Sequence, residues 1–99
     1  MSRPDAVLAA AEVEATLQKI LGHHQVKVRP YGHHLLIQMD LGDEVETVAR
    51  LTEYDSRTYG IGFKSHRRRW EPLPEEGTLE EMTEAVASQL GPYLTPENY

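Results

Sequence analysis

The sequence contains no cysteine, and it has only one tryptophan and one phenylalanine among its 99 residues. The lack of cysteine excludes disulfide bonds and thiolate metal ligands, and it suits a reducing compartment. No apolar run approaches the roughly 20 residues that a membrane span requires. Charged side chains also interrupt the first 22 residues, where a signal peptide would have its apolar core. We therefore expect a cytoplasmic protein with no membrane partner.

The motifs of the common catalytic classes are missing as well. The chain has no Gly-x-Ser-x-Gly nucleophile elbow, no Gly-x-x-x-x-Gly-Lys phosphate loop and no His-Glu-x-x-His helix. Serine, histidine and aspartate occur near one another in the sequence, but such neighbours do not by themselves form a triad. We therefore predict a protein that is not an enzyme and that binds no cofactor.

Charge is unevenly distributed along the chain. The net charge is −6 with the histidines neutral, which repels nucleic acids and anionic membranes at long range. Residues 57–69 contain five cations and no acid, whereas residues 71–84 contain six glutamates and no cation. We interpret this pattern as a cationic segment that the following glutamates neutralise within the molecule.

Apolar spacing predicts a helix at each end of the chain. Apolar residues recur every three or four positions over residues 4–21, and Gly22 follows where a left-handed helix stop is expected. The second helix starts at Thr78, with Glu81 completing a capping box, and Gly91 stops it. The remaining tail, residues 93–99, is expected to fray.

Between the helices, apolar and polar residues alternate in four segments that short turns connect. Such alternation is typical of half-buried strands. The four predicted strands are residues 25–31, 34–41, 45–54 and 58–64. The order of helix, four strands and helix predicts one α+β domain over residues 1–99. We expect an antiparallel meander with both helices on one face of the sheet.

The segment after the fourth strand allows two interpretations. Residues 67–70 form either a short fifth strand or an irregular return, and Pro72 and Pro74 end it. In the fourth strand itself, Gly60 and Gly62 share one face, so either a helix packs closely there or the strand bulges. The sequence leaves both questions open.

The sheet face away from the helices carries more apolar side chains than a solvated face needs. Its predicted partner surface consists of Leu36, Val48, Arg50 and Tyr54. Exposed apolar patches commonly mark protein contacts, and a chain of this size gains buried area by pairing. We therefore favour a domain that acts through protein contacts, above all through forming its own homodimer.

Nucleic-acid binding is the alternative function, and it depends on the run Arg67, Arg68, Arg69 and Trp70. Arginine binds phosphate with paired hydrogen bonds and an indole ring stacks on a base, so this run suits single-stranded nucleic acid. Two features oppose it. The glutamates that follow can pair with the arginines, and strand alternation separates Arg68 and Trp70 from the other two arginines.

The histidines and the acidic cluster are interpreted without a metal. The doublets His23-His24 and His33-His34 bracket one strand and lie on the order of 25 Å apart, whereas zinc ligands lie about 2.1 Å from the metal. We interpret both doublets, and His66, as solvated residues of loops and turns. The acidic cluster lacks the spacing of an EF-hand loop, and we expect the three arginines to balance its charge. The cluster comprises Asp40, Asp43, Glu44 and Glu46.

A short motif precedes the last helix: Trp70-Glu71-Pro72-Leu73-Pro74-Glu75, followed by Thr78-Leu79-Glu80-Glu81. Upstream stand Val48-Ala49-Arg50, Tyr54 and Ser56-Arg57. On these residues, about a third of the chain, the protein resembles an uncharacterised family of small bacterial proteins that is classed as a domain of unknown function. The resemblance implies no activity, no catalytic residues and no ligand.

Overall fold

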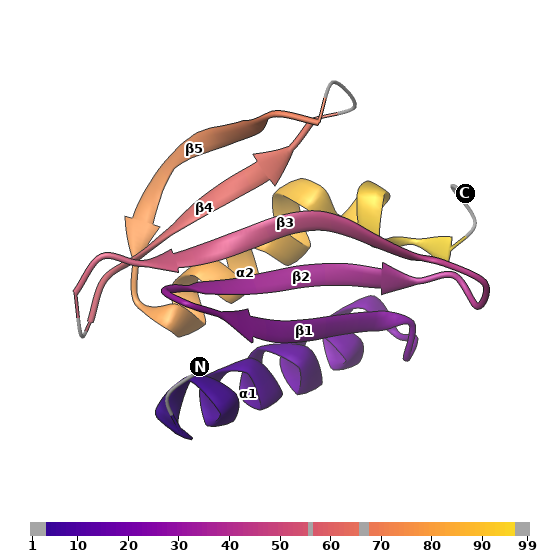
Figure 1. Ribbon diagram of the computed structural model, residues 1–99, viewed down its shortest axis with the longest axis horizontal. Helices are drawn as coiled ribbons and strands as arrows, with labels where there is room; N and C mark the ends of the chain where they lie inside the picture. Colours follow the sequence, from indigo (N-terminus) through magenta and orange to yellow (C-terminus); the bar gives the residue numbers. More distant parts are fainter. Residues whose placement is uncertain (1–3, 56, 66–67, 97–99) are drawn as a thin grey trace.

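The computed structural model describes residues 4–55, 57–65 and 68–96. It contains two α-helices, five strands and a closing 3-10 helix, and the strands form one antiparallel sheet in chain order. Both α-helices lie against the same face of the sheet (Figure 1). The predicted α+β class is confirmed. The elements are α1 (Pro4–Leu21), β1 (Val26–Tyr31), β2 (His34–Asp40), β3 (Val45–Glu53), β4 (Tyr59–Lys64), β5 (Trp70–Gly77), α2 (Leu79–Leu90) and η1 (Gly91–Leu94).

The strand count differs from the prediction, because a fifth strand follows β4. β5 contains Pro72 and Pro74, the residues that were expected to end the segment. Proline lacks a backbone N–H, but an edge strand needs donors on one side only, so prolines are tolerated there. β5 is an edge strand, and its register against β4 shifts between Gly60 and Gly62. Three residues of β5 stand opposite one residue of β4 there, so the irregularity lies in β5, and the bulge predicted as one of two alternatives for the glycine strand is not observed in β4.

A second irregularity lies in β3. Ile37 of β2 pairs with Ala49 and Gln38 pairs with Thr47, so Val48 is an extra residue in β3. A β-bulge of this kind re-aims one side chain and breaks the alternation of the strand. Val48 is 5% exposed and belongs to the core. Its prediction as part of the open partner surface is wrong for this reason.

The core lies between the sheet and the helices. The apolar residues of β2 alternate as predicted, those of β3 do so from Ala49 onward, and those of α1 and α2 meet them from the other side. Burying such side chains stabilises the fold by about 1.5–3 kcal/mol each. The largest fully buried side chains are Leu17, Ile37, Met39, Leu51, Leu94, Val13, Val26 and Val86.

The helix ends follow the predicted signals, except at the C-terminus. Gly22 has a φ of +76° and ends α1, and Thr78 and Glu81 form the predicted capping box at the start of α2. The α-helix ends before Gly91, but the chain continues into η1, where Leu94 is completely buried. His23 Nε2 lies 2.6 Å from the Leu94 carbonyl oxygen. The prediction that the tail frays is therefore wrong at Leu94.

Candidate functional site

The sheet has one face that neither α-helix covers, and Figure 1 views the molecule from this side. Cross-strand pairing determines which side chains share it, because directly paired residues point to the same face. The paired residues of β1 to β4 put cations and aromatic rings on this side. We call it the open face. By register it includes Lys27, Arg29, Tyr31, His34, Leu36, Gln38, Asp40, Arg50, Thr52, Gly60, Gly62, Lys64, Trp70, Pro72 and Glu76.

One row of the open face crosses the whole sheet. In register order it consists of Arg29, Leu36, Arg50, Gly62 and Pro72. Neighbouring strands lie about 4.8 Å apart, so the row spans roughly 19 Å. Because these residues stand in line across five strands, an extended ligand could contact several of them together.

Arg50, the central residue of this row, stacks on the ring of Trp70, which lies beside the row on β5. The guanidinium carbon lies 4.2 Å from the centroid of the indole ring, well within cation–π range. Lys64 pairs with Trp70 across β4 and β5, and its Nζ lies 6.0 Å from the same ring. A stacked guanidinium keeps its N–H groups at its edge, where they can donate to an anion. The stack therefore combines an anion donor with an aromatic surface.

The glycine between these residues leaves room for the stack. A Cβ on Gly62 would lie 3.3 Å from both Cγ and Nε of Arg50 and 3.5 Å from Cε3 of Trp70. Gly60 likewise leaves room for the ring of Tyr54. A Cβ added at Gly60 would lie 2.6 Å from Cε2 and 2.7 Å from Cζ of that ring. Side chains of the open face, rather than a helix, therefore cover Gly60 and Gly62.

The charge of the open face is opposite to that of the whole protein. Four cations lie on it, at Lys27, Arg29, Arg50 and Lys64, and none of them is ion-paired with another residue of the described ranges. Two carboxylates share the face by their strand register, Asp40 at its end and Glu76 on β5. The face therefore carries +2, while the net charge of −6 leaves −8 on the rest of the chain.

His34 is a residue of the open face whose surroundings shift its pKa. Its Nδ1 lies 2.9 Å from the hydroxyl oxygen of Thr52 on β3. Burial lowers the pKa of His34, and the positive charge of Arg50 and the neighbouring His33 lower it further. At neutral pH the ring is therefore uncharged, and it adds aromatic surface rather than charge to this face.

The predicted arginine patch is only partly assembled. Arg67 lies outside the described residues, and the side chains of Arg68 and Arg69 are exposed. Neither pairs with a glutamate within the described part of the chain, so the expected internal neutralisation is not observed for these two residues. Trp70 stacks with Arg50, which is distant in sequence. Sequence reasoning assigned Arg50 to the partner surface and missed its contact with the indole.

The predicted partner surface is also divided. Leu36 and Arg50 lie on the open face, and Tyr54, which is 58% exposed, lies over Gly60 beside it. Val48 is buried in the core. Leu36 pairs with Arg50 and Arg29 on its two sides, so the centre of this surface is flanked by cations. The apolar character that favoured protein contacts is therefore weaker than the sequence indicated.

Two further histidines, His23 and His24, have structural contacts, whereas His66 lies outside the described residues. His23 Nδ1 accepts a hydrogen bond from the Gln25 backbone N–H at 3.1 Å, so Nε2 carries the proton and donates it to the Leu94 carbonyl. His24 Nδ1 lies 3.4 Å from Gln18 Oε1. His23 is therefore a tethering residue rather than the solvated residue predicted. Across the described ranges, no group of three His, Asp or Glu side chains could hold a metal ion.

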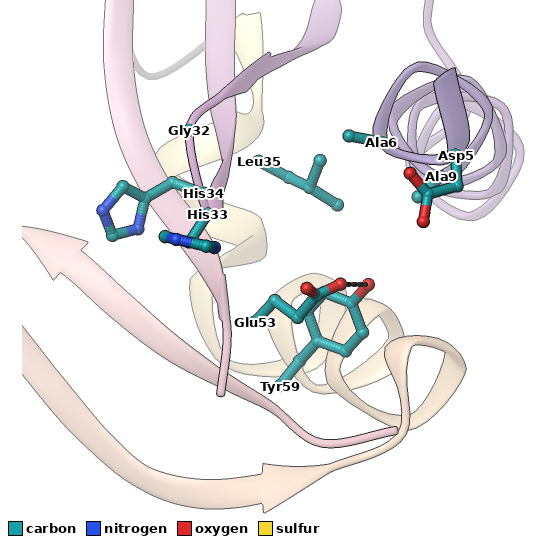
Figure 2. Close-up of a pocket in the computed structure, with 9 residues that line it drawn as sticks. All are labelled: Asp5, Ala6, Ala9, Gly32, His33, His34, Leu35, Glu53 and Tyr59. Atoms are coloured by element: carbon teal, nitrogen blue, oxygen red, sulfur yellow. Dashed lines mark hydrogen bonds between the residues drawn. The ribbon is translucent and has the colours of Figure 1, made fainter. Parts of the chain in front are cut away.

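A small cavity lies between α1 and the β1–β2 turn (Figure 2). Its volume is about 180 Å³, below the roughly 300–1,000 Å³ of usual ligand pockets. Tyr59 donates a hydrogen bond to Glu53 Oε2 at 3.0 Å inside it, and Asp5 faces them from α1. None of these three residues is without a partner. The cavity is therefore a weaker candidate than the open face.

A wider cleft of about 890 Å³ lies where η1 meets the ends of β3 and β4. Its apolar wall includes Phe63 and Tyr93, whose ring centroids are 4.9 Å apart. Lys64, Arg68 and Glu71 line its polar side. Because the cleft is open and borders the undescribed residues 66–67, we base the candidate site on the open face.

No protein-family model, curated protein or solved structure matches this chain. The resemblance to the uncharacterised bacterial family therefore stays a prediction. In the part of the chain that the structure describes, neither helix combines the length and apolar character required to cross a membrane.

Proposed function

We propose that this protein is a non-enzymatic domain of the cytoplasm that binds single-stranded nucleic acid across its open face. Modules of this type combine positive charge along a backbone track with aromatic rings on which bases stack. RNA-recognition modules, for example, stack two or three bases on the aromatic side chains of an exposed sheet. The open face has both properties, in a molecule whose remaining surface is acidic.

The observation that carries the proposal is the Arg50–Trp70 stack. It places a guanidinium 4.2 Å from an indole centroid on a solvent-accessible sheet, with the Lys64 ammonium 6.0 Å from the same ring. A base can stack beside the indole while Arg50 donates to the adjacent phosphate. Tyr31, which is 63% exposed, supplies a second ring at the opposite edge of the sheet. Arg68 and Arg69, exposed just before Trp70, extend the positive charge.

Homodimer formation through the same face is less favourable. A symmetric dimer places the same patch on both subunits, so the cations of one copy would meet those of the other. Like charges brought together at an interface cost several kcal/mol. A polyanion instead neutralises Arg29, Arg50 and Lys64 and releases its own counterions. Charge complementarity therefore favours nucleic acid over a second copy here.

The test is the anisotropy of a labelled oligothymidylate or oligouridylate titrated with the protein. If about three cations contact phosphates, the logarithm of the binding constant falls with that of the salt concentration with a slope of roughly −2. Affinity then drops roughly twentyfold between about 50 and 200 mM salt. Arg50→Ala should reduce this slope, and Trp70→Ala should weaken binding by about 1–3 kcal/mol.

The matched control is Lys19→Ala, which removes one exposed cation from α1 on the other side of the sheet. This change should leave affinity and salt slope as they are in the wild type. Polyphosphate and polyglutamate distinguish nucleic acid from other polyanions. Either of them binding as tightly as the oligonucleotide would contradict the proposal, because neither has bases to stack. So would the absence of oligonucleotide binding at about 50 mM salt.

A further inference from the structure

The solvent side of α1 is unusually apolar. Leu8 is 67% exposed and Val7 is 53% exposed, and the exposed Ala11 and Ala15 continue the same side of the helix. At 100° per residue these four positions fall within an arc of about 100°. The buried residues of α1, such as Leu17, lie on the opposite side against the sheet and α2. We call these four residues the α1 stripe. Nothing within the described chain covers it.

The α1 stripe can pack against the same stripe of a second copy, and the charges at the two ends of the helix favour an antiparallel arrangement. Ala11 and Ala15 are one helical turn apart and allow two helix axes to approach within about 8 Å. When two α1 helices run antiparallel, Ala11 of each faces Ala15 of the other, and Leu8 lies over Ala15 and the stem of Lys19. The first turn of α1 is acidic and its last turn is basic, so the same arrangement brings opposite charges together.

We propose that the protein forms a homodimer through antiparallel packing of the α1 stripe. The dimer leaves the open face of both copies accessible, so it does not depend on nucleic-acid binding. A helix of 18 residues is about 27 Å long and buries less than the roughly 800 Å² per partner of a standard interface. We therefore expect a weak dimer, with a Kd on the order of 100 µM.

Other routes to a homodimer are blocked by the fold. Edge strands can pair between molecules, but both edges of this sheet contain proline: Pro30 in β1, and Pro72 and Pro74 in β5. Proline removes the donor that a continuous sheet would need. The open face opposes a second copy through its positive charge. The α1 stripe has neither obstacle, and its Leu8 is the most exposed of the large apolar side chains in the described chain.

Sedimentation equilibrium up to about tenfold above the expected Kd measures the association directly. Leu8→Glu and Ala15→Glu place carboxylates in the α1 stripe and should each weaken the dimer at least about tenfold. Ile20→Glu is the matched control, because Ile20 is 51% exposed but lies about 120–180° around the helix from the stripe. It should leave association unchanged, and circular dichroism confirms that each variant is folded.

Cysteine crosslinking tests the orientation, because the chain has no native cysteine. An equal mixture of Ala11→Cys and Ala15→Cys chains should oxidise mainly to the mixed disulfide. In a parallel dimer each position would instead face its own copy, which gives the two symmetric disulfides. A predominance of symmetric products contradicts the antiparallel arrangement.

Three further results would overturn the proposal. The first is a wild-type protein that stays monomeric throughout the sedimentation range. The second is a dimer that Leu8→Glu and Ala15→Glu leave intact. The third is a dimer that Leu36→Glu dissociates while Leu8→Glu does not, because that result returns the interface to the sheet. Each outcome is independent of whether the open face binds an oligonucleotide.

Discussion

The two faces of the sheet are built from the same strands but differ in the side chains they carry. On β3, Ala49 and Leu51 are completely buried against the helices, whereas Arg50 between them points to the open face and stacks on Trp70. The covered face is mainly apolar and holds the fold together. The open face carries aromatic rings and cations that make no ion pair within the described residues, and these side chains add little to stability. The proposed function therefore places binding where the side chains do least for folding.

Alanine substitutions at neighbouring positions of β3 test this division with the largest expected effect. Leu51→Ala removes a fully buried side chain and should lower the free energy of unfolding by about 2–5 kcal/mol. Arg50→Ala should change it by less than about 1 kcal/mol while weakening oligonucleotide binding. Urea unfolding and anisotropy measure the two quantities. Two results would contradict this division between the faces. One is a Leu51→Ala variant that stays folded but loses binding, and the other is an Arg50→Ala variant that unfolds.

The C-terminal segment belongs to the covered side. Leu94 is completely buried in η1, and its carbonyl accepts a hydrogen bond from His23 Nε2. Leu94→Ala should destabilise the protein by about 2–4 kcal/mol without changing oligonucleotide affinity at temperatures where the variant is folded. Thermal unfolding followed by circular dichroism gives the change. Exposed Tyr93, changed to Ala, provides the control, and an equal loss in both variants would mean that the segment is not anchored by Leu94.

The N-terminal cap of α2 makes a moderate contribution to the stability of the covered side. The Thr78 hydroxyl accepts from the Glu81 backbone N–H at 3.1 Å, and Glu81 Oε1 accepts from the Thr78 N–H at 2.9 Å. Thr78→Ala should cost about 1 kcal/mol. The hydrogen bond from the Thr78 backbone N–H lowers the pKa of Glu81, and the Thr78 side chain lowers it further. The stability gained from this carboxylate is therefore present above its ordinary pKa and is lost as the pH falls. Unfolding curves at neutral and acidic pH should show the difference between wild type and Thr78→Ala shrinking in acid.

Alanine substitutions at the two glycines of β4 test whether the Arg50–Trp70 stack is central to binding. In Gly62→Ala the added Cβ would lie 3.3 Å from two atoms of Arg50, so the stack must shift. Oligonucleotide affinity should fall several-fold, with a stability change within about 1 kcal/mol. Gly60→Ala pushes only on the exposed ring of Tyr54, which can rotate away, and should affect affinity less. The fluorescence of Trp70 reports the shift, and the reverse ranking of the two variants would argue against a central role for the stack.

The smallest effect concerns pH and His34. Because burial lowers its pKa in the fold, the unfolded chain binds protons more readily below the ordinary value of about 6.5. Stability should therefore be constant with respect to this residue above pH 6.5 and should decrease as the pH falls below it. His34→Gln should reduce that decrease. Urea unfolding at a series of pH values compares the two proteins, and parallel curves would show that His34 does not titrate as described.

Most of the fold could be predicted because it depends on local patterns. The apolar periods gave both α-helices and the first four strands, and the capping residues Thr78 and Glu81 marked the start of α2. The fifth strand was left as one of two interpretations of residues 67–70, and its extent was missed because Pro72 and Pro74 oppose a strand in general. Only the edge position makes them acceptable. That position is a property of the assembled sheet rather than of the segment.

The candidate site was less predictable, for two physical reasons. The bulge at Val48 reverses which side chains face the core, and alternation alone gives no warning of it. The stack of Arg50 on Trp70 joins β3 to β5 across β4, so it depends on strand register and on the room that Gly62 leaves. The sequence did contain one signal, since two glycines on the same face of a strand indicated a close approach.

The central claim is that the open face, and no other surface, receives a single-stranded nucleic acid. Backbone amide NMR spectra recorded during titration with an oligothymidylate test it directly. We predict that the shifted signals cluster on β1 to β5 around Arg50, Lys64 and Trp70, while the exposed sides of α1 and α2 remain unchanged. Shifts confined to the cleft beside Tyr93 or to the helices, or no shifts at low salt, would contradict the account.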